Sequence, residues 1–131
     1  MLNRFYDSPA DIEVTFFFYS DCRKTPPHDG YRPAHLVLPD LLTSGVHHYY
    51  EMDYAPFNEN VKGSISFIQP EAYPNSMFLG KVIPIQEGRH VVGYAKVTKI
   101  LNPILKSDQG TERLEDGSLV STGTVLIDTL Y

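Results

Sequence analysis

The side chains of this sequence best suited to metal binding are its five histidines. His47 and His48 are adjacent, so on a strand their rings would point to opposite faces and could not easily share one metal ion. His28, His35 and His90 lie in different segments. Histidines that are satisfied in the core or exposed to solvent are the favoured interpretation, and we expect no metal site.

The other reactive side chains form no recognisable catalytic arrangement. Cys22 has two cations beside it, Arg23 and Lys24, which would lower the pKa of its thiol, but no catalytic histidine partner is identifiable. Glu51 and Asp53 would share one face of a strand, which suits cation binding or acid–base catalysis, and a solvated strand face explains them equally well. The phosphate, dinucleotide and serine-nucleophile motifs (GxxxxGK[ST], GxGxxG, GxSxG) are absent. We therefore expect neither an enzyme nor a cofactor.

Composition narrows the class of protein further. The chain has 131 residues, 42% of them hydrophobic, which fits one globular domain and argues against a disordered chain. Eleven Lys and Arg face 16 Asp and Glu, for a net charge of −5, which excludes a strongly basic nucleic-acid module. A single cysteine excludes an internal disulfide framework. No apolar run approaches the length of a membrane span, and no secretory signal is evident, so we expect a cytoplasmic protein.

The elements that must position these side chains read as strands. Short segments rich in Val, Ile, Phe, Tyr and Thr alternate with Pro and Gly, and no segment keeps a helical period. This pattern predicts an all-β sandwich or small barrel. The expected strands cover 12–19, 32–38, 46–52, 61–68, 77–85 (interrupted or ended by Pro84) and 89–101.

We expect a single domain over 1–131, with a barrel core over 12–101 and a C-terminal extension over 102–131. The extension carries two basic and five acidic residues, and Asp116-Gly117 is a hairpin-type turn signal. We interpret it as a hairpin packed on or near the barrel, with a flexible acidic tail as the alternative.

Several motifs recur in one order and at similar spacing in a known family. They resemble the third, C-terminal domain of bacterial elongation factor Tu, and the match covers about residues 12–101. A GYRP motif together with an EG-R-x-VG…V-x-K-[IV]-L ending is the most specific part of the resemblance. The matching segments are Thr25-Pro26, Gly30-Tyr31-Arg32-Pro33, Asn60-Val61-Lys62, Ile68-Gln69-Pro70 and QEGRHVVGYAKVTKIL over 86–101.

The resemblance implies a closed antiparallel barrel of about six strands. It also implies positive φ angles at Gly30 and Gly88, and core positions at Val91, Val97 and Ile100. The GTP-binding domain of the family is missing from this sequence, so we expect no GTP binding.

The same family contacts tRNA, which gives one hypothesis: an RNA- or tRNA-contacting accessory protein of translation. The phosphate-facing set would be Arg23, Lys24, Arg32, Thr43 and Gly88. The tyrosines Tyr49, Tyr50 and Tyr54 could stack on bases.

The second hypothesis, which we favour, is a non-catalytic protein-interaction module without membrane contact. It would mimic a translation-factor domain or act as an antitoxin or immunity-type inhibitor. An acidic chain suits a basic protein partner, and Gln69 replaces a lysine that some family members carry. The expected partner surface joins the 47–57 loop to the acidic tail, with His47, Tyr49, Tyr50, Tyr54, Asp108, Glu112, Glu115 and Asp116.

Overall fold

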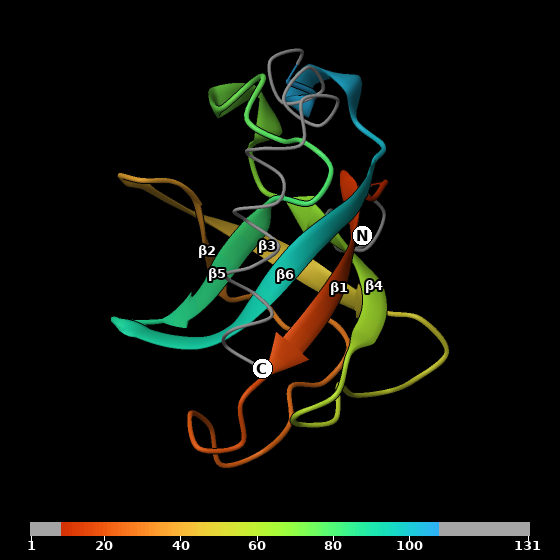
Figure 1. The fold of residues 1–131 in the computed structure, drawn as a ribbon, viewed down its shortest axis with the longest axis vertical. Helices are drawn as coiled ribbons and strands as arrows, with labels where there is room; N and C mark the ends of the chain where they lie inside the picture. The colour runs from red at the N-terminus through yellow and green to blue at the C-terminus, as the bar shows by residue number, and fades with distance from the viewer. Residues whose placement is uncertain (1–8, 108–131) are drawn as a thin grey trace, which may run out of the picture.

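Six antiparallel strands close into a barrel in the order β1-β4-β3-β2-β5-β6 (Figure 1). A computed structural model describes residues 9–107 of the chain. Because β1 pairs with both β4 and β6, the sheet has no free edge, and the predicted closed barrel of about six strands is confirmed. The strands are β1 (Ile12–Phe18), β2 (Ala34–Leu38), β3 (Leu41–Tyr49), β4 (Val61–Phe67), β5 (Val82–Glu87) and β6 (His90–Ile100).

Alternation along each strand separates an inner face from an outer one. In β1 the side chains of Ile12, Val14, Phe16 and Phe18 are buried, while the residues between them are half-buried on the outer face. The aromatic run in this segment predicts burial on both faces, but its outer face is only half-buried. β4 turns Val61, Gly63, Ile65 and Phe67 inward, as its alternation predicts.

Two strand boundaries differ from the sequence prediction. β3 begins at Leu41 rather than Val46, because Pro39 and Asp40 form a tight turn that pairs Leu38 directly with Leu41. The strand predicted over 77–85 begins at Val82 and continues through Pro84. Proline is tolerated there because β2 pairs with β5 only further along, at Ile85 and Gln86, so the missing N–H is not needed.

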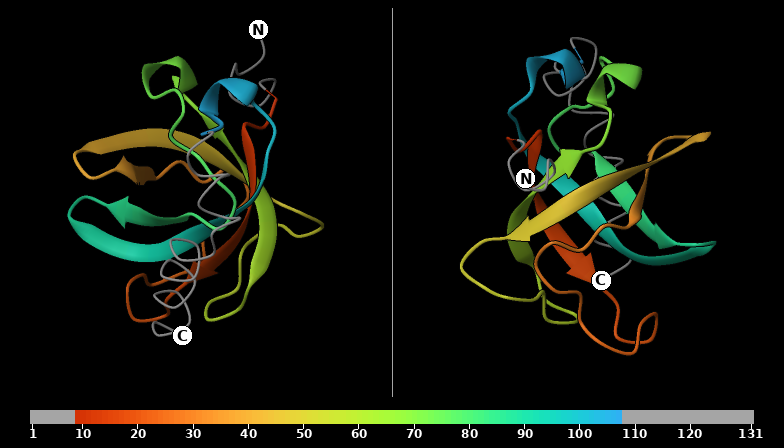
Figure 2. Two further views of the ribbon diagram at one scale, coloured as in Figure 1. Left: turned by 45° about the horizontal axis from the view of Figure 1, so that its top comes forward. Right: turned by 180° about the vertical axis from the view of Figure 1, so that it is seen from behind.

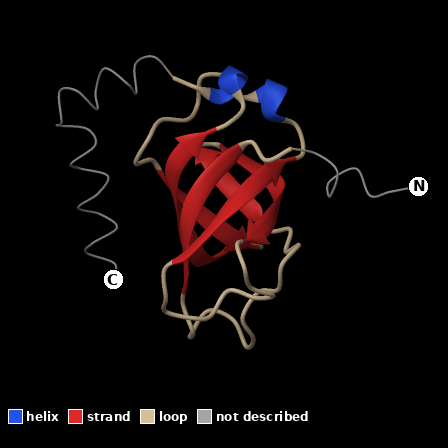
Figure 3. Cartoon of the chain, turned by 90° about the vertical axis from the view of Figure 1, so that its right-hand side faces the viewer, coloured by secondary structure: helices blue, strands red, loops and turns tan. Residues whose placement is uncertain are grey.

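The two ends of the barrel are built differently (Figure 3). At one end lie two short 3₁₀ helices, η1 (Pro70–Ala72) and η2 (Pro103–Leu105). At the other end the long β1–β2 and β3–β4 connections lie against each other, as both views in Figure 2 show. The hairpin predicted around Asp116 lies outside the described residues. None of the helices in the described part of the chain is long and apolar enough to cross a membrane.

Asp11 joins three strands at the helical end of the barrel. Its carboxylate accepts hydrogen bonds from the Phe67 backbone N–H, at 2.7 Å, and from the Asn102 side-chain amide, at 2.9 Å. Its backbone carbonyl accepts two more, from the N–H groups of Leu101 and Asn102. Asp11 therefore links the start of β1 to the ends of β4 and β6. Burial is the main reason that the pKa of its carboxyl is raised.

Candidate functional site

A chain of polar groups crosses the interior of the barrel. His35 of β2 and His47 of β3 both point inward, and their Nε2 atoms lie 2.8 Å apart. His35 Nδ1 lies 3.0 Å from the Thr43 carbonyl oxygen, and His47 Nδ1 lies 3.0 Å from the Tyr49 hydroxyl. The rings of Phe16, Phe18 and Tyr31 surround His47.

The direction of every hydrogen bond in this chain follows from its carbonyl end. The Thr43 carbonyl can only accept, so His35 Nδ1 carries a proton and donates it. In a neutral ring the other nitrogen then accepts, so His47 Nε2 must donate to His35 Nε2. His47 Nδ1 is left as an acceptor, and the Tyr49 hydroxyl donates to it. Both rings are therefore fully satisfied in the neutral state.

Burial keeps both imidazoles uncharged. It lowers the pKa of His35 to about 4, against the opposing effect of the bond to Thr43. The pKa of His47 is lowered well below its ordinary value, by burial and by the neighbouring His35. Burial also raises the pKa of the Tyr49 hydroxyl. Because the ring nitrogens are hydrogen-bonded within the protein and the rings are buried, the pair joins β2 to β3 inside the barrel and has no free nitrogen to bind a ligand.

The expected partner surface is therefore wrong for His47 and Tyr49. His47 is 1% exposed and Tyr49 0% exposed, because strand alternation turns both into the core. The expectation that His47 and His48 point to opposite faces is confirmed, since His48 is exposed. The tail carboxylates expected on the same surface, at 108, 112, 115 and 116, lie outside the described residues.

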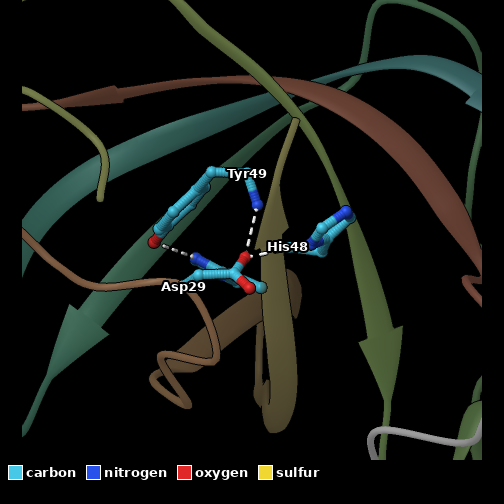
Figure 4. Close-up of polar contacts among 4 residues, drawn as sticks. Asp29, His48 and Tyr49 are labelled. Atoms are coloured by element: carbon cyan, nitrogen blue, oxygen red, sulfur yellow. Dashed lines mark hydrogen bonds and ion pairs between the residues drawn. The ribbon is translucent and has the colours of Figure 1, made fainter. Parts of the chain in front are cut away.

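Asp29 fastens the β1–β2 connection to the end of β3 (Figure 4). Its Oδ1 atom accepts a hydrogen bond from the Tyr49 backbone N–H at 2.8 Å and lies 3.0 Å from His48 Nδ1. Its own backbone N–H donates to the Asp53 carbonyl at 2.8 Å. A further bond joins the Ala55 N–H to the Pro27 carbonyl at 2.9 Å, so the two long connections are held together on both sides of Tyr54.

These bonds hold in place the exposed residues 51–54, which we call the acidic loop. Glu51, Met52, Asp53 and Tyr54 are all exposed, and the two apolar side chains are 42% (Met52) and 46% (Tyr54) exposed. The expectation that Glu51 and Asp53 share a strand face is wrong, because β3 ends at Tyr49. Tyr50 is half-buried beside the loop.

Glu51 has a φ of 60°, in the left-handed region that favours glycine. Asn58 and Asn75 share this conformation, but asparagine tolerates it far better than a longer side chain does. The acidic loop thus keeps a glutamate where the backbone favours glycine, and such strain is concentrated at functional positions.

The phosphate-facing set implied by the resemblance does not form one surface. The Arg23 guanidinium lies 4.7 Å from the Tyr31 ring centroid, and its Nη1 is 3.1 Å from the Glu87 carboxylate. Glu87 also accepts a hydrogen bond from the Tyr31 hydroxyl. Arg23 is thus already neutralised by a carboxylate, and its side chain is only 18% exposed.

The other members of that set lie apart. The Thr43 hydroxyl lies 3.3 Å from the Tyr73 hydroxyl, at the helical end of the barrel. Arg32 lines a separate hollow with Ser44 and Ile68. Gly88 turns from β5 into β6 with a φ of 59°, and Gly30 has a φ of 89°, so the positive φ expected at both glycines is confirmed. Lys24 is exposed on the β1–β2 connection.

The core positions implied by the resemblance are confirmed only in part. Val97 is buried, and Ile100 packs against the core, but Val91 is only half-buried. The neighbouring Val92 is buried instead, because the register of β5 and β6 shifts between Ile85 and Gln86, opposite that position.

Two further reactive side chains have no catalytic setting. Cys22 is exposed, and the pKa of its thiol is raised, first by burial and then by Asp21, so its basic neighbours do not activate it. Lys81 donates from Nζ to the carbonyls of Val37 and Ser76, at 2.6 and 2.5 Å. Burial lowers the pKa of its ammonium group to about 8. Among residues 9–107 no three His, Cys, Asp or Glu side chains are grouped so as to hold a metal ion.

The outer face of β1, β4 and β6 carries a group of lysines whose proximity could not be predicted from the sequence. Thr15 of β1 pairs with Lys62 on one side and Lys96 on the other, and Glu13 pairs with Lys99. These lysines are far apart in sequence, and only the strand pairing brings them together. A hollow of about 310 Å³ lies between Lys62 and Lys99, lined by Glu13, Val14, Thr15, Tyr50, Lys62, Gly63, Thr98 and Lys99.

Comparison with known proteins gives no relative from which a role can be carried over: no protein-family model matches the chain, and no curated protein matches it significantly.

Proposed function

We propose that this chain is a non-catalytic protein-interaction module that binds a basic protein partner through the acidic loop. The observation that supports this most directly is the exposure of Met52 and Tyr54 on a loop pinned by main-chain hydrogen bonds to the neighbouring connection. A pinned loop loses little conformational entropy when it binds, and exposed tyrosines are frequent anchors of protein interfaces.

Charge defines the kind of partner. The β3–β4 connection over 50–60 carries Glu51, Asp53 and Glu59 and has no Lys or Arg. Carboxylates beside exposed apolar anchors favour a basic partner surface and accelerate its association. Such a partner fits both roles expected from the sequence, namely the mimic of a translation-factor domain and the inhibitor of a basic toxin such as a nuclease.

The test is site-specific photocross-linking in host lysate, with the cross-linker placed at position 54. We expect one protein to be captured from position 54 and not from position 106, an exposed residue that directly follows η2 at the helical end of the barrel. With the partner purified, we expect Tyr54→Ser to weaken binding about tenfold, a typical loss for an interface anchor. Equal capture from both positions, or unchanged affinity in Tyr54→Ser, would refute the proposal.

Glu51→Gly separates binding from folding. Glycine relieves the positive φ at this position, so the variant should be at least as stable as the wild type. It removes one carboxylate from the acidic loop, so we expect weaker binding to the partner and a smaller dependence of affinity on salt. A variant that is stable and still binds with unchanged salt dependence would exclude Glu51 from the interface.

A further inference from the structure

We propose that the outer face of β4, β1 and β6 binds single-stranded nucleic acid, with lysines on the phosphates and aromatic rings on the bases. The residues of this face, which we call the lysine–aromatic face, come from three strands that are neighbours in the barrel (Figure 1). They differ from the residues of the acidic loop, so this proposal does not depend on the protein-interaction proposal.

The strand register arranges the face in rows. The first row holds Ser64, Glu13 and Lys99, and the second holds Lys62, Thr15 and Lys96. Neighbouring strands lie about 4.8 Å apart, so the backbones of Lys62 and Lys96 are about 10 Å apart, with Thr15 between them. Along β1 and β4 successive rows on one face are about 6.8 Å apart. On β6 the register shifts between the two rows, so Thr98 is an extra residue between Lys96 and Lys99. Three ammonium groups on long, flexible side chains are thus gathered over one small area.

The third row is aromatic. Phe17 of β1 pairs with Tyr94 of β6, directly beyond the pair of Thr15 with Lys96. Tyr19, just beyond the end of β1, adds a third ring, whose centroid lies 5.4 Å from that of Phe17 and 6.0 Å from that of Tyr94, both in edge-to-face contact. All three rings are half-buried on the outside of the barrel. A basic patch beside half-exposed rings is the combination that binds single strands, because phosphates need cations and every base can stack on a ring.

The charge of the face stands out from the rest of the barrel. Residues 12–101 carry eight basic and nine acidic side chains, yet this face gathers three lysines around one carboxylate, Glu13. The hollow among these residues leaves room for a ligand beside Thr15. The lysine–aromatic face is therefore a local basic site on a chain that is acidic as a whole.

Fluorescence anisotropy with a labelled uridine oligomer of about 12 nucleotides tests the proposal, since single-strand sites span about 4–16 nucleotides. Three phosphate contacts on a single strand predict a slope of about −2 for log affinity against log salt. Each of Lys62→Gln, Lys96→Gln and Lys99→Gln should reduce the steepness by about 0.7. Lys106→Gln, in an exposed lysine that follows η2 at the helical end of the barrel, is the matched control and should leave the slope unchanged.

Two further variants test whether binding depends on the positive charge of the face and on base stacking. Glu13→Gln removes the only carboxylate from the rows and should tighten binding, which a damaged fold would not do. Tyr94→Leu should weaken binding about fivefold or more, the loss expected for one stacking ring. Phe78→Leu, in a half-buried ring on the β4–β5 connection, should not. Thermal unfolding of each variant confirms that the barrel is intact.

Each of these measurements has a result that would contradict the proposal. No binding at low salt, or a slope that Lys106→Gln changes as much as Lys96→Gln does, would overturn it. Binding of a duplex as tightly as the single strand would overturn the stacking role of the rings, as would unchanged binding by folded Tyr94→Leu. Ribose and deoxyribose oligomers of one sequence then distinguish RNA from DNA as the source of the strand.

Discussion

His35 and His47 make the stability of the barrel sensitive to acid. Both rings are buried, and each ring nitrogen already has a partner in the series of hydrogen bonds that runs from the Thr43 carbonyl to the Tyr49 hydroxyl. A proton added to either ring would have to displace a hydrogen bond in a site that water does not reach. Near pH 6.5 and below, the folded protein therefore binds fewer protons at these two rings than the unfolded chain does.

We expect the free energy of unfolding to fall as the pH is lowered from 7 to 5. The unfolded state binds more protons in this range, because the pKa of His35 is about 4 when folded and near 6.5 when unfolded. His35 alone should account for a loss of about 2 kcal/mol, and His47 adds to it. Urea denaturation at a series of pH values measures this loss.

The control for this prediction is an exposed histidine. His90→Gln alters the first residue of β6 and should leave the acid dependence intact. Replacing the buried side chains together, as His35→Leu with His47→Leu and Tyr49→Phe, should remove most of it. An acid dependence that survives in this variant would assign the protons to other groups.

The directions of the His47 and His48 side chains could be predicted from the sequence, but the contact between His35 and His47 could not. The opposite directions of His47 and His48 follow from strand geometry alone. The contact between His35 and His47 depends on how β2 pairs with β3, where His35 lies opposite Thr43. No local pattern encodes that register. The same limit hid the lysines at 62, 96 and 99, which only the pairing of β1 with two distant strands brings together.

At the scale of elements, glycines set how closely the strands approach. Gly63 of β4 faces β3, and a Cβ atom built on it would lie 2.2 Å from the His48 carbonyl oxygen and 2.8 Å from the Phe16 ring. The first contact is with backbone, which cannot move without breaking the β3–β4 pairing. The hydrophobic pattern predicted that Gly63 faces inward, but it could not show why a side chain is excluded there.

We expect Gly63→Ala to destabilise the barrel by about 3 kcal/mol or more, because the extra methyl group must displace strand backbone. Gly88→Ala is the matched control: no atom lies within 4 Å of its added Cβ, and only the positive φ opposes it. That strain should cost about 1 kcal/mol. Urea denaturation compares the two, and a Gly63→Ala loss no larger than that of Gly88→Ala would show that the strands can separate.

Strand type was easier to predict than strand limits. The composition and alternation of 61–68 and 89–101 predicted strands close to those observed, because each forms a single uninterrupted run. The start of β3 was missed because the pattern at Leu41 to Gly45 contains polar and small residues. Those positions are held as strand by pairing with β2 and not by their own propensity.

At the scale of the whole molecule, closing the barrel is the least local event in folding. β1 pairs with β6 along its full length, with Ile12 opposite Ile100, and these strands lie near opposite ends of the described chain. The β5–β6 hairpin, in contrast, closes through a short turn at Gly88. Loop-closure entropy makes the distant pairing slow, so contacts at the β1–β6 junction should form after the hairpin.

Asp11 lies at this junction and lets the order be measured. Asp11→Ala removes the acceptor of the Phe67 and Asn102 hydrogen bonds and should cost about 2 kcal/mol. If closure comes last, the loss appears mainly as faster unfolding, and the folding rate changes little. Gly88→Ala, in the hairpin turn, should instead slow folding in proportion to its cost. Stopped-flow tyrosine fluorescence is the measurement, since the chain has nine Tyr and no Trp. Folding slowed by the full cost of Asp11→Ala would place barrel closure in the folding transition state.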